Sequence, residues 1–428
     1  MSKSADLTGA PVYRAVHNFM RILYVTQIVP YPPHGGVLQR GYNLLRELGR
    51  HHAVHLLAFH HRDELPPGEA VDRSKRELRQ FCESVEYFDL WPKRSALHML
   101  VGLFVAAFSR RPFSVHAHRS PRLSARIAGI CRSERRPDIV HLDTIALAPY
   151  ARDCGRIPVV LAHHNIESRL MERRAEYERG FLRRWYVRRE AAKLRSYEAA
   201  VCAEFRANVT VSAEDSRELR EICPSAIAEA IPNGVDTEYF VPRRGDETES
   251  LIFTGGMNMF ANRDGVDWFI ESVWPLVKRD VPRASFVAIG QRPSVKLMEA
   301  VERNEGVEAP GFVADVRPAV ARAAVYIVPL RVGGGTRLKV LDAMAQGKAI
   351  VSTSLGAEGI DIRDGEHMVI ADDAAAFAAR IVALLRDPAR RRALGDAARV
   401  RAEERYAWSM LGRRLADVYQ RAIAGSSA

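Results

Sequence analysis

Cysteine is scarce in this sequence of 428 residues, and its cysteines follow no recognisable pattern. The five cysteines are widely spaced and none belongs to a CxxC pair, which argues against a disulfide framework and against a zinc site. The sequence also has no DxD motif, a common pair of ligands for a divalent cation. We therefore expect no metal, and a reducing cytoplasm is the simplest location.

Long hydrophobic runs are also missing. The most apolar run, from Ala96 to Phe108, is shorter than the roughly 20 residues that a helix needs to cross a bilayer. Residues 1–20 contain no apolar core of the kind that a secretory signal carries, and we interpret them as a flexible tail. The net charge of +11 calls for an anionic partner, and nucleic acid, a phosphorylated small molecule and an anionic membrane surface all qualify.

Two common nucleotide-binding motifs are absent. The segment Gly35–Gly41 fails the spacing of GxGxxG, which removes the main support for a nicotinamide or flavin enzyme. A P-loop would require glycine at Asp342 and a hydroxyl residue at Ala349. If a phosphate binds here, another kind of turn must hold it.

Short apolar segments that alternate with helical stretches dominate the chain, and they predict parallel sheets covered by helices. A polar, turn-rich stretch from Ile231 to Thr248 divides the alternation into two runs. We therefore predict an α/β protein with two doubly wound domains that face each other across a cleft, residues 21–230 and 231–407, and a last helix in 408–428 that can pack back on the first domain. The predicted strands are Ile22–Gln27, Val54–Phe59, Val85–Leu90, Asp138–Leu142, Val159–His163, Asn208–Ser212, Leu251–Gly255, Ser285–Gly290, Val325–Pro329 and Ala349–Thr353.

The segment PLRVGGGTRLKVLDAMAQGK, residues 329–348, predicts a phosphate-binding turn. Its glycines follow a buried strand and precede residues with helical periodicity. A helix start presents unpaired N–H groups and a partial positive charge, and glycine lets an anion approach the backbone. Arg337 and Lys339 add full positive charges, although solvated cations beside a flexible turn remain an alternative interpretation.

The first domain offers a second turn of this kind. Gly35 and Gly36 lie between the first predicted strand and a helix, so one helix start from each domain could hold a diphosphate; alternatively, the glycines only relieve a strained turn. His163 and His164 close another strand at the carboxyl edge of the sheet, where open α/β sheets bind ligands. Either histidine could position a substrate hydroxyl or be structural.

A basic segment with interleaved aromatic residues lies between Arg169 and Arg206 and predicts one or two long charged helices. Together with the apolar run at Ala96, it could dock on anionic lipid. The alternative is that the run belongs to the core and the arginines pair with neighbouring glutamates.

The motifs of this chain resemble those of retaining glycosyltransferases of family 4, which have the two-domain GT-B fold. The resemblance extends from about Arg21 to Trp408. It is closest to sugar transferases associated with exopolysaccharide and exosortase gene clusters. The matching motifs are HGG, HHNIES, VSAEDS, IPNGVDTEYF, FTGGMN and PLRVGGGTRLKVLDAMAQGKAIVSTSLGAEGI.

This resemblance implies transfer of a sugar from a nucleoside-diphosphate donor, without a metal, to a hydroxyl of a glycan or lipid-linked acceptor, in exopolysaccharide or cell-surface glycan synthesis. The enzyme would work in the cytoplasm or at the inner face of the membrane. His164, Arg337 and Lys339 would be catalytic, and Asp342 would bind the ribose as the second acid of the family's Glu, seven residues, Glu pattern. The donor-binding residues implied are Gly35, Gly36, Gly255, Gly334, Gly335, Thr336, Arg337, Lys339 and Asp342.

The sequence departs from the family pattern at two places. The first acid of the pattern falls at Gly334, so the carboxylate that usually holds the donor sugar is missing. The family's Arg and Lys after the first strand of the second domain are also missing, unless Arg263 substitutes. We expect Arg337 and Lys339 to neutralise the diphosphate instead.

Two other functions compete with sugar transfer. A nucleotide-sugar epimerase with the same architecture would act on the donor alone, without an acceptor. A basic protein that binds nucleic acid or membrane would explain the charge but would leave the glycine turns without a role, and no recognised nucleic-acid module is present, so we expect no nucleic-acid partner.

Overall fold

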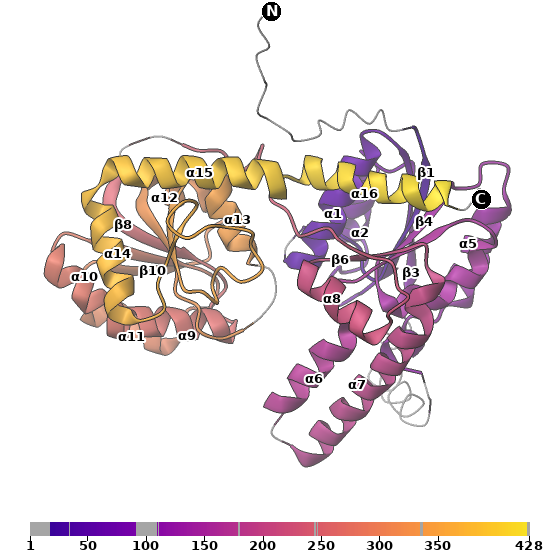
Figure 1. Ribbon diagram of the computed structural model, residues 1–428, viewed down its shortest axis with the longest axis horizontal. Helices are drawn as coiled ribbons and strands as arrows, with labels where there is room; N and C mark the ends of the chain where they lie inside the picture. Colours follow the sequence, from indigo (N-terminus) through magenta and orange to yellow (C-terminus); the bar gives the residue numbers. More distant parts are fainter. Residues whose placement is uncertain are drawn as a thin grey trace, which may run out of the picture.

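Two parallel-sheet domains make up the chain, and two helices at its C-terminal end join them (Figure 1). The computed structural model describes residues 18–33, 35–90, 109, 111–178, 180–243, 245, 247–333 and 337–425. This architecture confirms the predicted fold class. The expectations for residues 1–17 of the tail and for the Ala96–Phe108 run lie outside the described residues.

The N-terminal domain is built on a sheet with the strand order β3-β2-β1-β4-β5-β6-β7, in which all neighbouring strands are parallel. Its described strands are β1 (Arg21–Thr26), β2 (Ala53–His60), β3 (Ser84–Asp89), β4 (Ile139–Leu142), β5 (Val159–Ala162), β6 (Ala207–Thr210) and β7 (Ala228–Ala230). Its helices are α1 (Gly36–Gly49), α2 (Glu69–Leu78), α4 (Phe113–Ala117), α5 (Pro121–Arg132), α6 (Glu167–Tyr177), α7 (Phe181–Val201) and α8 (Ala213–Ile222), with 3₁₀ segments at Ile145–Cys154 and Cys202–Glu204.

The C-terminal domain has a second parallel sheet, with the order β10-β9-β8-β11-β12-β13. Its described strands are β8 (Thr248–Thr254), β9 (Ser285–Ile289), β10 (Val307–Gly311), β11 (Ala323–Val328), β12 (Ala349–Ser352) and β13 (Val369–Ile370). The helices are α9 (Phe260–Trp268), α10 (Trp274–Asp280), α11 (Val295–Arg303), α12 (Arg317–Arg322), α13 (Leu338–Ala345), α14 (Ala374–Arg386), α15 (Pro388–Tyr406) and α16 (Trp408–Ala424), with a π-helical segment at Phe269–Val273.

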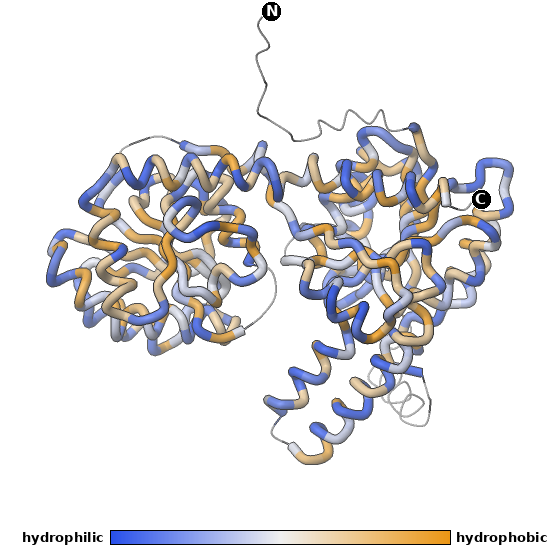
Figure 2. Tube along the Cα trace, viewed as in Figure 1, coloured by the Kyte–Doolittle hydropathy of each residue, from blue (hydrophilic) through white to orange (hydrophobic). Residues whose placement is uncertain are grey.

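The central strands are largely apolar because helices cover both faces of each sheet. Strands β4, β5, β11 and β12 are completely buried. Figure 2 shows the same division, with hydrophobic segments inside each domain and hydrophilic ones on the outer helices. All ten strands predicted from the sequence are present, whereas β7, β10 and β13 were not predicted.

The last helix, α16, crosses from the C-terminal domain to the N-terminal one (Figure 1). Its apolar residues Leu411, Leu415 and Tyr419 are fully buried in the N-terminal core. Gly412 allows the close approach to α1, because a Cβ atom at this position would lie 2.5 Å from the Cβ of Glu47. Burial of this apolar face therefore ties the end of the chain to the first domain.

Two arginines of α1, one buried and one partly exposed, also fix the connection between the domains. Arg40 of α1 donates to the Pro232 carbonyl at 3.0 Å and to the Asn233 side chain at 3.2 Å. Arg46 pairs with Asp236 at 2.9 Å. Both arginines thus attach α1 to the segment that leads into the second domain.

Helices α6 and α7 form a hairpin that projects from the body of the N-terminal domain (Figure 1). This hairpin contains most of the basic segment noted in the sequence. Of the helices in the described ranges, none combines the length and the hydropathy that a membrane span requires.

Candidate functional site

The C-terminal domain brings two glycine turns together at one point of its sheet. Strands β8 and β11 are neighbours, although β9 and β10 lie between them in sequence. The chain therefore leaves β8 and β11 toward opposite sides, which is the switch point where parallel sheets bind ligands. The turn at Gly255 follows β8, and the loop before α13 follows β11.

Lys339 lies at the centre of this arrangement. Its Nζ donates to Oδ1 of Asn262 at 2.6 Å and lies 4.2 Å from the centre of the Phe253 ring. The amide of Asn262 in turn donates to the Gly256 carbonyl at 2.8 Å. The ammonium is thus held over the end of β8 by a side chain that the sequence did not single out.

Gly255 makes room for this ammonium. A Cβ atom at position 255 would lie 2.5 Å from Nζ of Lys339 and 2.9 Å from Nδ2 of Asn262. Any side chain at this position would therefore displace the lysine. Burial, together with the charge of Arg337, lowers the pKa of Lys339 to about 7.

Arg337 immediately precedes α13, and its guanidinium turns back onto the loop. It donates to the Gly333 carbonyl at 3.0 Å and to the Leu355 carbonyl at 3.4 Å, and its Nη2 lies 3.8 Å from a carboxylate oxygen of Glu358. Burial lowers its pKa, whereas Glu358 raises it. Arg337 therefore stabilises the loop as well as adding positive charge to the site.

Asp342 lies one turn further along α13, on the side of the helix that faces the sheet. Burial raises its pKa to about 7, and its charge contributes to the raised pKa of Tyr326, whose hydroxyl contacts Thr254 at 2.5 Å. Within the described residues, no hydrogen bond or ion pair engages the Asp342 carboxyl. A partly accessible carboxyl without a protein partner can accept hydroxyl groups from a ligand.

Two helix starts, one from each domain, meet at this point. A Cβ atom at Gly36, the first residue of α1, would lie 3.8 Å from Cδ1 of Leu338, the first residue of α13. Gly35, with a φ of 91°, precedes α1, and neither helix has a side chain that caps its first turn. The unpaired N–H groups of both helices therefore remain available to an anion.

The structure gives the two neighbouring histidines different surroundings. His163 is buried, and its Nε2 contacts Oδ1 of Asn208 at 3.1 Å. Burial lowers the pKa of His163 to about 4, which fits a structural role. His164 instead places Nε2 at 3.2 Å from Oδ2 of Asp143, and its side chain is 6% exposed.

Asp143 follows β4 and is the centre of a buried polar cluster. Burial opposes its ionisation, but His164 and His141 together hold its pKa below the ordinary value. On the far side, the Tyr419 hydroxyl of α16 contacts Nδ1 of His141 at 2.8 Å. The cluster therefore connects His164 with the C-terminal helix.

One other candidate position lies apart from this region. Arg263 donates to the Met257 carbonyl at 3.4 Å and lines a hollow of about 350 Å³ with Asp264, Trp268 and Arg331, while its neighbour Asn262 faces Lys339. Gly334, Gly335 and Thr336 lie outside the described residues. No group of three or more potential metal ligands occurs in the ranges that the structure describes.

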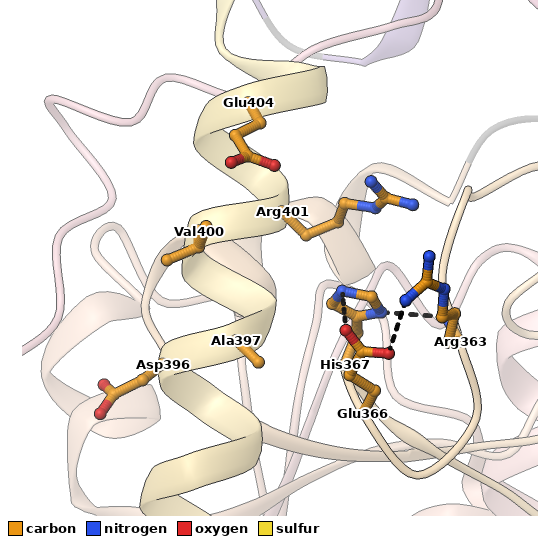
Figure 3. Close-up of a pocket in the computed structure, with 8 residues that line it drawn as sticks. All are labelled: Arg363, Glu366, His367, Asp396, Ala397, Val400, Arg401 and Glu404. Carbon is orange, nitrogen blue, oxygen red and sulfur yellow. Dashed lines mark hydrogen bonds and ion pairs between the residues drawn. The ribbon is translucent and has the colours of Figure 1, made fainter. Parts of the chain in front are cut away.

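A further hollow, of about 380 Å³, lies between α15 and the loop before β13 (Figure 3). Three of its charged groups pair with one another: Arg363 contacts Glu366 at 3.1 Å, and His367 lies 3.6 Å from the same carboxylate. It contains none of the residues predicted for ligand binding. We therefore assign the candidate site to the meeting point of α1 and α13.

This site combines features that suit a ligand with phosphate groups and hydroxyl groups. The two helix starts and the ammonium of Lys339 favour negative charge, and Asp342 can accept hydroxyl groups. Negative charge that develops on a leaving phosphate would be stabilised here. The arrangement therefore suits cleavage of a bond to a diphosphate.

Family models match most of the chain. Residues 34–239 match the model described as Glycosyltransferase Family 4, and residues 248–387 match the model described as Glycosyl transferases group 1. The chain is also 28% identical over 219 residues to a GDP-mannose-dependent alpha-(1-6)-phosphatidylinositol monomannoside mannosyltransferase of Mycolicibacterium smegmatis. This match covers 46% of the chain and 56% of the relative.

Two other similarities complete the comparison. An uncharacterised 44.6 kDa protein in the cps region of Klebsiella pneumoniae is 30% identical over 141 residues, which cover 31% of this chain and 36% of that protein. These matches thus span less than two thirds of the relatives' own length. The crystal structure of Anabaena HepE in complex with UDP has a similar fold, with a TM-score of 0.64, 13% identity and coverage of 93% of this chain and 99% of that one.

Proposed function

The chain belongs to glycosyltransferase family 4, and we propose that it transfers a sugar from a nucleoside-diphosphate sugar to a hydroxyl of a glycan or lipid-linked acceptor, with retention of configuration. Its two parallel-sheet domains are the GT-B fold. We further propose that it acts in exopolysaccharide or cell-surface glycan synthesis, in the cytoplasm or at the inner face of the membrane. The motif resemblance supports this role.

The observation that carries the proposal is the approach of Gly36 to Leu338, because it brings two uncapped helix starts from different domains together. A diphosphate between them would accept hydrogen bonds from backbone N–H groups of both domains. Lys339 would neutralise one of its charges, and Asp342 would accept the ribose hydroxyls. UDP in the similar structure of Anabaena HepE supports a nucleoside diphosphate as the ligand class.

In the proposed reaction, the bond between the anomeric carbon and the diphosphate oxygen breaks, and the acceptor oxygen bonds to the same face of that carbon. The departing phosphate oxygen takes the proton of the acceptor hydroxyl, so no protein base is needed. Lys339, Arg337 and the helix starts stabilise the leaving diphosphate more strongly in the transition state than in the ground state. His164 would face the donor sugar, and no metal takes part.

A thermal-shift panel of UDP, GDP and ADP, with their sugar conjugates, tests the donor site. We expect at least one nucleotide to stabilise the parent chain and to lose most of its effect on Arg337→Ala and Asp342→Ala. Arg331→Ala is the matched control, since Arg331 lies on the same loop but is exposed and pairs with Asp264 at 2.9 Å. Variants that respond to the ligand as the parent does would rule out this site.

A second measurement separates transfer from epimerisation. Product formation that depends on an added acceptor indicates a transferase, whereas conversion of the donor alone indicates an epimerase. The anomeric configuration of the product, read by NMR, tests retention. Undiminished activity after chelation of divalent cations is the result expected for a reaction without a metal.

A further inference from the structure

The α6–α7 hairpin carries a large apolar surface at its free end. Phe181 is 81% exposed, Leu182 is 75% exposed and Trp185 is 53% exposed. All three belong to the first turns of α7, at the point of the hairpin that lies furthest from the domain (Figure 1). Figure 2 shows hydrophobic segments at this end and hydrophilic ones along the hairpin. We call Phe181, Leu182 and Trp185 the apolar tip.

Basic residues continue the exposed face of α7 behind the apolar tip. Phe181, Trp185, Arg188 and Arg195 follow one another at helical spacing and are all exposed. The guanidinium of Arg189 lies 5.6 Å from the centre of the Trp185 ring. The helix therefore has aromatic residues at its N-terminal end and positive charge along the rest of its exposed face.

The acidic residues of the hairpin do not balance this charge, because several of them face inward. Glu190 accepts the Phe113 N–H at 2.8 Å and pairs with Lys193, and Glu198 accepts the Ser168 hydroxyl at 2.5 Å. Both glutamates are buried, and burial raises the pKa of Glu198 to about 7. The outward charge is thus more positive than the composition of the segment indicates.

Some of the basic residues have carboxylate partners and others have none. Arg169 pairs with Glu172 and Glu221, and Arg173 lies 3.9 Å from Glu218. In the described part of the chain, no ion pair engages four exposed arginines, Arg174, Arg183, Arg188 and Arg195. The expectation that glutamates neutralise the arginines therefore holds for only part of the hairpin.

We propose that the apolar tip and the arginines behind it dock the protein on an anionic membrane surface. Aromatic side chains enter the boundary between headgroups and acyl chains, while arginines behind them remain among the phosphates. A second copy of this chain fits the tip poorly, since it carries the same arginines and the same net charge of +11. Charge complementarity thus favours anionic lipid.

The position of the hairpin relates this surface to the proposed reaction, on which this part of the argument rests. Helix α6 begins at Glu167, three residues after His164, so the base of the hairpin lies beside the histidine that the proposed reaction places at the donor sugar. Helix α7 has 21 residues, a length of about 30 Å at the usual rise of a helix. Docking at the tip would hold the site at about this distance from the headgroups, within reach of an acceptor linked to lipid.

Flotation of the full-length chain with vesicles tests the docking. Vesicles of phosphatidylcholine with about 30% phosphatidylglycerol, at about 0.15 M salt, should carry the protein upward, and vesicles of phosphatidylcholine alone should not. The triple variant Phe181→Ser, Leu182→Ser, Trp185→Ser should remain at the bottom. The pair Arg183→Gln, Arg188→Gln, whose arginines lie close behind the tip, should lower the partition coefficient about fivefold for each charge.

Matched controls change equally exposed residues of the other domain. Phe312, which is 75% exposed, is replaced by Ser, and Arg283 and Arg392 are replaced by Gln; both controls should float as the parent does. Failure of the parent to float, or equal losses in the controls, would contradict the proposal. So would a dimer of the parent that the triple variant converts to a monomer.

Nucleotide binding in the absence of vesicles separates this proposal from the proposed reaction. The triple variant should keep the thermal shift that UDP or GDP gives the parent, because the tip is remote from the candidate site. A parent that floats but responds to no nucleotide would contradict the donor site and leave the docking intact.

Discussion

Nucleotide binding should be accompanied by proton uptake, because Lys339 is buried beside the site. Burial, together with the charge of Arg337, lowers the pKa of Lys339 to about 7, so at pH 8 only about a tenth of the side chains carry the proton. A bound diphosphate favours the charged ammonium and restores a high pKa. Binding at pH 8 should therefore take up about 0.9 protons at Lys339.

Asp342 changes this number only slightly. Its pKa of about 7 leaves most of the carboxyl groups ionised at pH 8, and completing their ionisation on contact with the ribose would release about 0.1 proton. The expected net uptake is then about 0.8 protons per nucleotide bound. Isothermal titration of UDP or GDP in Tris and in HEPES gives this number, as the slope of the observed enthalpy against the ionisation enthalpy of the buffer.

Two variants make this measurement specific. Lys339→Met should bind more weakly and show almost no proton uptake. Lys296→Met should behave as the parent does, since Lys296 is an exposed lysine of the same domain that pairs with Glu271 at 2.8 Å. Tight binding without proton uptake in the parent, or undiminished uptake in Lys339→Met, would refute the role assigned to this lysine.

Three further substitutions have defined outcomes. Gly255→Ala should weaken nucleotide binding at least about tenfold in titration calorimetry, because the added Cβ would displace the end of Lys339. Asp342→Asn should stabilise the free protein by about 2 kcal/mol more at pH 8 than at pH 5 in urea unfolding, since a carboxyl whose pKa is raised from 3.8 to about 7 destabilises the fold progressively as pH rises between these two values. An equal effect at both pH values would contradict its burial. Asp143→Asn should lower the free energy of unfolding by about 3 kcal/mol at pH 7 in the same assay, because it leaves His164 without its buried partner. A loss below about 1 kcal/mol would show that the pair is not buried in solution.

The sequence predicts the long apolar strands of this fold correctly because burial on both faces produces continuous runs of apolar residues. Strands β1 and β11 are examples. The three missed strands are short or lie at sheet edges: β7 has three residues, β13 has two, and β10 contains a proline. These segments contain too few apolar residues to be recognised as strands, because they become part of a sheet only by pairing with a neighbouring strand.

The glycine turns of the candidate site could be predicted, because glycine next to a helix start has a local physical reason. The supporting side chains could not. Asn262 is one polar residue within a helix, and its role depends on the approach of Lys339 from a segment 77 residues away. Asp143 likewise acquires its surroundings from β5 and from the C-terminal helix, through contacts that no local pattern records.

Hydrogen–deuterium exchange with and without UDP or GDP tests the central claim most directly, because it locates the nucleotide on the full chain. Binding between the helix starts should slow exchange at the beginning of α1, from Gly36, at the turn after Gly255, and at the beginning of α13, from Leu338. All three segments should respond together, and the hollow at His367 should not. Slowed exchange confined to one domain, or centred on the hollow at His367, would contradict a nucleotide-sugar site shared by the two domains.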